Sequence, residues 1–466
     1  MWIFGKDSAS SLSSIGLNFQ NDPVPGFTIS PSDSSRSFSV AGPYRIDWSV
    51  QKATNRKKPE PVSLFSVHIP TTGVAAADVD RIFSSIRQTV KSMKTLRHPN
   101  MLNWLAGTDV GVVDTKLPEH FHMITEYVVP LREYLRTKAD SGNFNFISSW
   151  GIHQISRAIV FLNDEAKISH NAIRLDAVFV AVSGEWKLGN LDFAGPVGKP
   201  VPETRMTASF AQSIPNQSDP YLPPDNCLID SWGLGCLIWE IFNPDLGLRD
   251  RAQLTASSSL QRFPKCLVAD YRRLVAPSGN RGAKRRCTVA QFVAHASNAD
   301  HGGFFANKYV DTLLFLEQIQ LKDAQEKSKF LSTLGDQVSN FPDDVCRHKI
   351  LPHLLNGLHY GSAGIEALIP VLRLLPLLSE SEFQSDVLPC LVKLFAAPER
   401  ATRVRLLDQL PNFVKDIPPK VVEKQIFTSV ASGFSDVNPL VREATVRAMV
   451  HLAPKLSGKT LNDTLP

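Results

Sequence analysis

The sequence predicts an α+β domain followed by a long all-α region. Residues 44–69 give two strand-like stretches, YRIDWSVQ and PVSLFSVHI, and an amphipathic helix follows them. From about residue 305 the texture changes to leucine-rich helices at regular intervals. We therefore expect an N-terminal arm over 1–40, the α+β domain over 41–298 and the helical region over 305–466.

The composition is typical of a soluble globular protein. Hydrophobic residues make up 43% of the 466 residues and charged residues 20%, which is enough to build packed cores. The net charge of +5 does not by itself indicate nucleic-acid binding. No apolar run approaches the ~18 residues that a membrane span needs, and the first residues lack a signal-peptide pattern. We expect a protein of the cytosol or nucleus that reaches membranes only through partners.

The cysteines do not indicate a metal site or a disulfide framework. None of them forms a Cys-x-x-Cys pair, and no Cys/His cluster has zinc-site spacing. We expect buried thiols in a reducing compartment. The six are Cys227, Cys236, Cys266, Cys287, Cys346 and Cys390.

Further elements follow from local pattern. The arm is rich in Ser, Asp and Pro and is expected to be loosely ordered. Apolar residues at spacings of three and four predict helices over about 79–96 and 147–163. The stretch LDAVFVAVSGEWKLG predicts a hairpin that turns at Ser183-Gly184. The stretch LIDSWGLGCLIWEIF is apolar almost all round, which predicts a fully buried helix.

The helical region has an internal period. The apolar stretches that begin at Ile350, Val387 and Ile426 are 37 and 39 residues apart. This period fits HEAT-type repeats, in which each helix pair stacks on its neighbours to bury its apolar face. The stretch SDVNPLVREATVRAM, residues 435–449, has the acidic, Val-Arg and Ala pattern of such a repeat. The last repeat lacks a polar cap, so we expect the sequence to stop inside a longer solenoid.

Five stretches of the α+β domain, in order, resemble a protein kinase. RHPNML resembles the segment after the regulatory helix, and MITEYV resembles the hinge strand, with Thr125 as gatekeeper and Glu126 at the hinge. YLPPD stands at the Ala-Pro-Glu position, DSWGLGCLIWE resembles the central helix of the C-lobe, and RRCT stands at the Arg-Pro-Thr position. The resemblance implies a bilobal kinase-like fold, with the N-lobe over about 41–127 and the C-lobe over about 128–298.

The resemblance also shows which catalytic parts are missing from the N-lobe. Phosphoryl transfer needs a glycine-rich loop, a lysine on the phosphates and a glutamate that holds the lysine. After Gly42 the next glycine is Gly73, so the glycine-rich loop is missing. Phe65 stands at the lysine position, and Thr89 stands at the glutamate position with Gln88 beside it.

The catalytic loop and the metal motif are degenerate too. ISHNAIRLDAVFV lies over the catalytic loop and places Ala172 at the catalytic aspartate and Ala177 at the metal-binding asparagine. The stretch KLGNLDFAG looks like a metal motif, but counting from the preceding strand puts Asn190 at the aspartate position. Asn is a weak ligand for a hard cation because it has no charge. A minor alternative is that Asp192 binds a metal in a rearranged loop.

Residues that build the kinase scaffold are retained. His170 matches the first residue of the catalytic loop and is expected to make a core hydrogen bond. Asp225 and Arg286 are expected to form the ion pair of the kinase fold. Asp230 is expected to brace the backbone of the catalytic loop.

Beyond the kinase fold, the sequence resembles the Scy1-like (N-terminal kinase-like) pseudokinases. The resemblance rests on MWIF, VSLF, SHNAIRLDAVFV and GEWKLGNLDF together with the repeats, and it covers roughly residues 40–460. It implies a non-catalytic cytoplasmic scaffold that needs no cofactor. Members are linked to Golgi-to-ER traffic through coatomer and Arf-type GTPases, and some to nuclear tRNA export and the nuclear pore.

Three hypotheses of function follow. We favour a scaffold that acts through protein contacts, located in the cytoplasm and at the Golgi or the nuclear pore. A residual nucleotide sensor or weak kinase is an alternative. A tRNA-binding adaptor is another, based on the basic stretches at 55–58 and 280–286, although solvated loops are the more ordinary interpretation. Arg442 and Arg447 are candidate partner contacts on the solenoid, although a role within the repeat is the commoner one.

Overall fold

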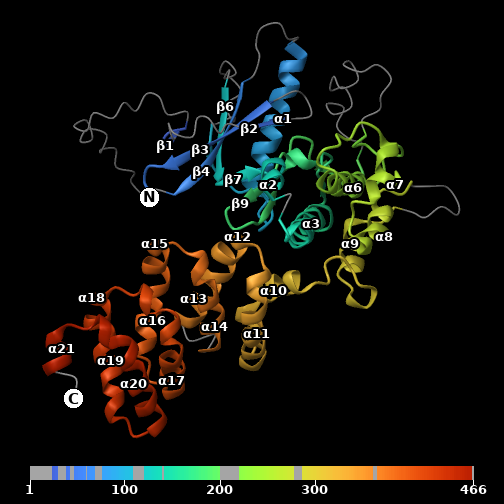
Figure 1. Cartoon of the computed structure of the whole chain (residues 1–466). Helices are drawn as coiled ribbons and strands as arrows, with labels where there is room; N and C mark the ends of the chain where they lie inside the picture. Colours follow the sequence, from blue (N-terminus) through green and yellow to red (C-terminus); the bar gives the residue numbers. More distant parts are fainter. Residues whose placement is uncertain are drawn as a thin grey trace, which may run out of the picture. The chain divides into compact units, whose positions relative to one another are not determined.

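A computed structural model of the chain divides it into two compact units, each described here by itself (Figure 1). The second unit consists of Phe304–Pro466 together with Asp140–Trp150 and Val182–Gly184, and the first unit holds the remainder up to Gly303. The described residues are 24–29, 38–41, 47–58, 60–68, 76–108, 120–138, 141–199, 220–277, 286–359 and 365–463.

An antiparallel sheet forms the first part of the first unit. Its order is β1-β3-β4-β6-β5, and β2 also pairs with β3. The central strand β4 places Phe65 opposite Val50 of β3 on one side and Met123 of β6 on the other. The helix α1, Ala76–Thr95, follows β4 and agrees with the predicted helix. The strands are β1 Phe27–Ile29, β2 Phe38–Ala41, β3 Asp47–Asn55, β4 Pro61–His68, β5 Trp104–Gly107 and β6 His120–Glu126.

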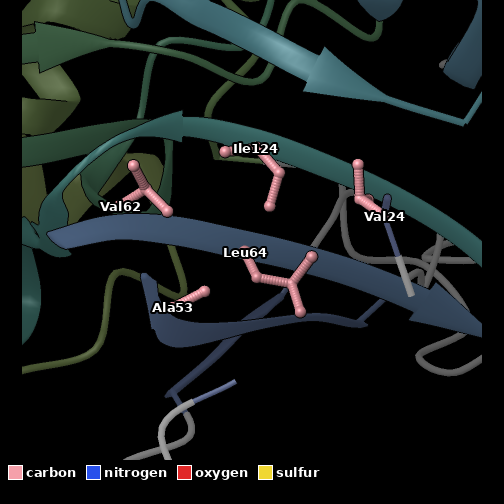
Figure 2. Close-up of a cluster of buried hydrophobic side chains, with 5 residues drawn as sticks. All are labelled: Val24, Ala53, Val62, Leu64 and Ile124. Carbon is pink, nitrogen blue, oxygen red and sulfur yellow. The ribbon is translucent and has the colours of Figure 1, made fainter. Parts of the chain in front are cut away.

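Part of the arm that was expected to be loosely ordered joins this sheet. Val24 is 4% exposed and packs against Leu64 and Ile124, as Figure 2 shows. Strand β1 pairs antiparallel with the end of β3, and its Phe27 lies against the same cluster. Three apolar residues within six positions are sufficient to anchor the chain here, because their burial removes apolar surface from water. Most of the remaining arm lies outside the described residues.

The second part of the first unit is mainly helical. The predicted hairpin is formed by β9 and β10, and Gly184 in its turn has a φ of +75°. Helix α6, Ile229–Phe242, is buried at every position from Asp230 onward, as its apolar sequence predicts. The strands are β7 Val128–Pro130, β8 Ile168–Ser169, β9 Val178–Ala181, β10 Trp186–Leu188 and β11 Gly195–Pro196. The other helices are α2 Leu131–Lys138, α3 Phe144–Val160, α7 Ser257–Leu260, α8 Lys265–Leu274 and α9 Val289–Ala296.

The second unit is all-helical in its described residues, and its helices recur in a regular order. The larger ones are α10 Lys308–Glu317, α11 Ala324–Gln337, α13 Leu351–His359, α14 Leu368–Leu374, α16 Leu388–Phe395, α17 Arg400–Gln409, α19 Phe427–Ala431, α20 Pro439–Leu452 and α21 Gly458–Asp463. Three short helices precede α13, α16 and α19 and run into them through a π-helical turn. They are α12 Asp343–Val345, α15 Glu380–Glu382 and α18 Pro419–Val421.

The predicted period is visible in these π-helical turns. Ile350, Val387 and Ile426 are each the last residue of such a turn, and all three are fully buried. The helices therefore begin before the apolar stretches from which the period was counted, at Asp343, Glu380 and Pro419. The π-helical turn recurs at the same position in each repeat, before α13, α16 and α19. This recurrence indicates that each repeat buries its apolar face in the same way.

Ion pairs also recur between successive repeats. Arg373 of α14 lies 2.8 Å from the carboxylate of Asp336 at the end of α11. Arg447 of α20 lies 3.7 Å from Asp408 of α17. The two pairs span 37 and 39 residues (373 − 336 and 447 − 408), so a carboxylate meets an arginine one repeat later. Each exposed pair stabilises the stack by no more than about 1 kcal/mol.

The N-terminal half of α3 belongs to the core of the second unit. The ring of Phe146 lies 5.4 Å from that of Tyr309 and 6.2 Å from that of Phe341. The side-chain amide of Asn307 donates to the hydroxyl of Ser149 at 3.2 Å. The second unit is therefore built from stretches that are far apart in the sequence.

Candidate functional site

The lysine position of the kinase resemblance is the centre of an aromatic cluster. Phe65 points from β4 into the interior and is fully buried. Its ring lies edge-on to Phe179 of β9 with centroids 5.2 Å apart and edge-on to Trp48 of β3 at 6.5 Å. Trp48 in turn contacts Phe121 of β6 at 6.0 Å. Edge-to-face aromatic pairs are favourable beyond the area they bury. The place that would hold a phosphate-binding cation is thus an apolar core.

Thr89, at the position expected for the glutamate, makes a different contact from the lysine–glutamate ion pair that catalysis needs. Thr89 of α1 is buried and donates a hydrogen bond from its hydroxyl to the carboxylate of Asp192. Gln88 donates from its side-chain amide to the carbonyl of Ala194 at 3.2 Å. Burial raises the pKa of Asp192 to about 6, and the hydrogen bond from Thr89 opposes this rise. Asp192 therefore joins α1 to the segment after Asn190.

The carboxylate of Asp192 and the side-chain amide of Asn190 both make hydrogen bonds within the fold. In the described part of the chain, no group of three or more His, Cys, Asp or Glu side chains is placed to hold a metal ion. The side chain of Asn190 donates to the carbonyl of Asp176 at 3.0 Å, so it stabilises the loop from inside. Asn190 also has a φ of +53°, a left-handed conformation that Asn tolerates better than most residues.

The segment predicted to correspond to the catalytic loop is held in place by internal hydrogen bonds. Ala172 and Ala177, at the positions expected for the base and the metal ligand, are both buried. The backbone N–H of Ala172 donates to Nδ1 of His170 at 3.2 Å, so the imidazole is neutral and its Nε2–H donates to the carbonyl of Gly189 at 2.8 Å. His170 is therefore a core hydrogen-bonding residue here.

Asp230 at the start of α6 braces this loop. Its carboxylate accepts hydrogen bonds from the backbone N–H groups of His170 and Asn171 at 2.8 and 2.7 Å. It also accepts from the side chains of Asn163 and Ser169 at 2.8 and 3.0 Å. A buried carboxylate with four donors is well satisfied, which explains how it is tolerated at 3% exposure.

Glu240, at the other end of α6, makes a second brace that the sequence analysis matched to the kinase motif without giving it a role. Its carboxylate accepts from the backbone N–H of Leu175 at 3.0 Å and from the hydroxyl of Tyr221 at 2.8 Å. The guanidinium of Arg174 stacks on the Tyr221 ring, 4.5 Å from its centroid. Burial raises the pKa of Glu240, while these hydrogen bonds and Arg174 oppose the rise.

Asp225 and Arg286 meet in an ion pair. The Arg286 guanidinium is fully buried and donates to both carboxylate oxygens of Asp225, at 2.9 and 3.3 Å. It also donates to the carbonyl of Cys227 and lies 5.0 Å from the centre of the Trp232 ring. This forked geometry is specific to arginine and orients the segment before α6.

The arginines singled out on the solenoid contact their own unit. Arg442 donates to the carbonyls of Asp436 and Val437 at 2.7 and 3.1 Å. Arg447 pairs with Glu443 at 3.2 Å and with Asp408 at 3.7 Å, and its side chain is 63% exposed. Arg442 therefore holds the turn before α20, whereas Arg447 presents part of its guanidinium to solvent.

Together these contacts define the class of protein. The first unit has the strand order, helices and bracing carboxylates of a protein-kinase fold, and the positions predicted to be degenerate are those of Phe65, Thr89, Ala172, Ala177 and Asn190. It is a pseudokinase domain, and an all-helical region follows it. Among the described helices, none is long and apolar enough to span a bilayer.

Comparison with known proteins gives the particular relationship. The chain is 30% identical over 427 residues to the probable inactive serine/threonine-protein kinase scy1 of Dictyostelium discoideum, covering 89% of this chain and 48% of that protein. It is 27% identical over 403 residues to the mouse protein-associating with the carboxyl-terminal domain of ezrin, covering 80% of this chain and 49% of that protein. The resemblance to the Scy1-like inactive kinases is thus confirmed.

The comparison of structures supports the fold. The crystal structure of Cex1p aligns with 98% of this chain and 77% of that chain, with a TM-score of 0.61 at 19% identity. At this identity the likeness concerns the fold, a kinase-like domain followed by helices. No family model matches the sequence. The chain spans about half the length of the curated relatives described above.

Proposed function

We propose that this chain is a non-catalytic scaffold that acts through protein contacts. The observation that carries the proposal is the position of Phe65. Its ring packs on Phe179 and Trp48 where a kinase needs a lysine beside phosphate. A polyphosphate placed there would lose its hydration and meet aromatic rings without a compensating cation, which is strongly unfavourable. The proposed functional positions are the degenerate residues themselves and the bracing residues His170, Asp225, Asp230 and Arg286.

A thermal shift measurement tests the inactive cleft. The chain is heated with millimolar ATP or ADP, with and without Mg²⁺ or Mn²⁺. Ligand at ~100 times its Kd would stabilise the folded state by about 2.7 kcal/mol. We expect no shift with any nucleotide. A clear shift would favour the alternative function, a nucleotide sensor or weak kinase, and would require a phosphate site other than the Phe65 position.

We further propose that the partners are proteins of vesicle traffic. The resemblance to Scy1-like proteins supports coatomer and Arf-type GTPases as the first candidates, and the mouse relative is itself named for associating with the carboxyl-terminal domain of ezrin. A cytoplasmic location with Golgi association goes with this proposal. The functional divisions would be the arm over 1–40, the pseudokinase over 41–298 and a HEAT-type solenoid over 305–466.

Binding of purified coatomer and of an Arf-type GTPase to the immobilised chain tests the partners. The variant Phe65→Leu tests whether binding depends on the aromatic ring at position 65, because leucine keeps this part of the core apolar. We expect the variant and the wild type to bind with equal affinity, with or without ATP and Mg²⁺. Absence of binding to both proteins would contradict the traffic proposal but leave the inactive cleft untouched.

A tRNA-binding adaptor at the nuclear pore is the second candidate. It is favoured by the exposed basic turn that contains Arg56, Lys57 and Lys58. The other basic stretch, 280–286, lies outside the described residues except for Arg286, which is buried in its ion pair. Phosphate contacts make affinity fall steeply with salt. The double variant Lys57→Ala/Lys58→Ala should weaken tRNA binding and flatten its salt dependence if this function is correct, and should change neither if it is not.

A further inference from the structure

A groove of about 670 Å³ lies between two successive turns of the second unit. One wall contains the 3₁₀ turn Leu375–Leu377 and the other contains the 3₁₀ turn Val414–Asp416. Apolar side chains line part of it, among them Leu378, Phe383 and Ile417. Its volume is in the range of sites that bind a small ligand or a few residues of a peptide.

At the junctions before and after this groove, the chain itself supplies a cation. The ammonium group of Lys455 donates to the carbonyl oxygens of Lys415 and Ile417 at 2.8 and 2.6 Å, so it joins the third turn to the fourth. The guanidinium of Arg347 donates to the carbonyl of Leu377 and joins the first repeat to the second turn. Charged donors make strong hydrogen bonds to such carbonyls, which explains why both junctions are closed in this way.

The internal period shows that the groove lacks the ammonium group. A shift of 39 residues relates Lys455 to Asp416 (455 − 416). The same shift relates the two capped carbonyls to those of Pro376 and Leu378 (415 − 376 and 417 − 378). Asp416, Pro376 and Leu378 all line the groove. Among the described residues, no side chain donates a hydrogen bond to either of these two carbonyls. A carboxylate therefore stands where the following junction has its cation.

The guanidinium is replaced as well. A shift of 37 residues relates Arg347 to Gln384 (384 − 347). Gln384 is neutral, and its side-chain amide donates to the carboxylate of Glu380, four residues earlier, at 3.1 Å. Glu380 lines the groove together with Asp416. Both devices that close the neighbouring junctions are thus missing, and two carboxylates are present instead.

We propose that this groove binds a lysine side chain from an extended segment of a partner protein. The lysine ammonium would lie at Asp416 and the carbonyls of Pro376 and Leu378, as Lys455 lies on the equivalent carbonyls within the chain. Lysine suits this place because its ammonium is a compact charge with three donors. Apolar residues beside the lysine contact the apolar lining. The proposal rests on the scaffold function in one respect, that the partner is a protein, and it names the surface that holds that partner.

Saturation-transfer NMR on the full chain tests the site with two peptides. The first is acetyl-Ala-Pro-Lys-Leu-amide, which copies residues 453–456. The matched peptide carries norleucine in place of lysine, so it keeps the apolar stem without the charge. We expect the lysine peptide to bind with a Kd of roughly 0.1–1 mM and at least ~10-fold more tightly than the norleucine peptide. Absence of binding by the lysine peptide, or equal binding of the two, overturns the proposal.

Substitutions in the chain show where the peptide binds. Asp416→Lys supplies the ammonium from the chain itself and should lower the affinity at least ~10-fold. Asp463→Lys makes the same charge change at an exposed position of α21 that does not line the groove, and it should bind like the wild type. Lys415→Ala removes an exposed lining ammonium next to Asp416 and should tighten binding.

Circular dichroism checks that the three variants stay folded. Peptide binding that survives Asp416→Lys unchanged overturns the proposal, because the peptide then binds elsewhere. Each of these results is independent of the inactive cleft, which the nucleotide measurement tests separately. A peptide that fails to bind therefore removes this surface without removing the scaffold function.

Discussion

The ring of Phe65 stands edge-on against the ring of Phe179, with 5.2 Å between the centroids. Phe65 comes from the six-stranded sheet and Phe179 from the hairpin that follows the catalytic loop. In an active kinase the first position carries a cation and nucleotide lies between these two elements. Here two aromatic side chains contact each other directly, so the space is used for packing.

Restoring the lysine should damage the fold without restoring nucleotide binding. Phe65→Lys would bury an ammonium group where the Phe65 ring now packs against the rings of Trp48 and Phe179. We expect the free energy of unfolding to fall by more than about 3 kcal/mol. Urea denaturation measures the loss. Phe65→Leu, the control, should lose only about 1–2 kcal/mol.

Nucleotide binding is measured on the same variant. The melting temperature of Phe65→Lys should be unchanged by millimolar ATP and Mg²⁺. A variant that becomes both stable and nucleotide-responsive would show that a phosphate site survives around this position.

Asp192 should make stability depend on pH. Burial raises its pKa from 3.8 to about 6, so the folded protein holds a proton between about pH 4 and 6 that the unfolded chain has lost. The favourable contribution of protonation is complete below pH 4 and is lost as the pH rises through 6. Asp192→Asn stays neutral and still accepts from Thr89. Between pH 4 and 7 the variant should gain up to about 3 kcal/mol over the wild type.

Denaturant unfolding of both proteins at several pH values gives this difference directly. Other titrating groups affect both proteins alike and cancel. A stability difference that is the same at pH 4 and pH 7 would mean that Asp192 does not titrate in this range.

Replacing Arg286, the buried member of the ion pair with Asp225, should lower the free energy of unfolding strongly. Arg286→Ala removes the guanidinium from the Asp225 carboxylate and from the Trp232 ring, with an expected loss of about 3–5 kcal/mol. Asp225→Ala should leave Arg286 buried with one remaining carbonyl partner at Cys227. A double-mutant cycle, measured by urea unfolding, gives the coupling energy. Arg286→Lys is the control for charge, since it keeps the cation but loses the fork. Coupling below about 0.5 kcal/mol would contradict the role assigned to this pair.

The segment 296–304 should resist proteases. The backbone N–H of Gly303 donates to the carbonyl of Asn298 at 3.0 Å, and the Asn298 side chain accepts from the N–H of Asp300 at 2.8 Å. A Cβ at Gly303 would lie 2.3 Å from the carbonyl of Ala296, so Gly303→Ala must open the turn. Brief subtilisin digestion followed by mass spectrometry should show cleavage here in the variant only. Gly458→Ala is the control, because a Cβ there meets open space. Rapid cuts in the wild type would refute the prediction.

The degenerate positions are predictions that rest on short motifs. Ala172 and Ala177 are located by their distance from His170 along one continuous loop, and Asn190 by its distance from the end of a strand. Such local counting needs no knowledge of tertiary packing. The all-round apolar character of α6 is equally local, which is why its burial could be predicted.

What the sequence did not reveal depends on contacts between distant segments. Thr89 and Asp192 are 103 residues apart, and no local pattern indicates that an aspartate would satisfy the threonine. The aromatic cluster consists of Trp48, Phe65, Phe121 and Phe179, which lie on four different strands. In the sequence, each of them resembles an ordinary buried strand residue. Their alternation with smaller residues was the available signal, but it indicates burial and not which rings meet.

The division of α3 has a consequence for biosynthesis. Ser149 and its hydrogen-bond partner Asn307 are 158 residues apart in the sequence. The two rings that contact Phe146, those of Tyr309 and Phe341, are also synthesised much later than Phe146. A ribosome adding 5–20 residues per second needs roughly ten seconds or more to supply the missing side of that core. During this interval the N-terminal half of α3 keeps an apolar surface without its partners. Chaperone capture of the nascent chain is expected during this interval. A protein fragment that starts at residue 304 would lack part of the apolar core of the second unit.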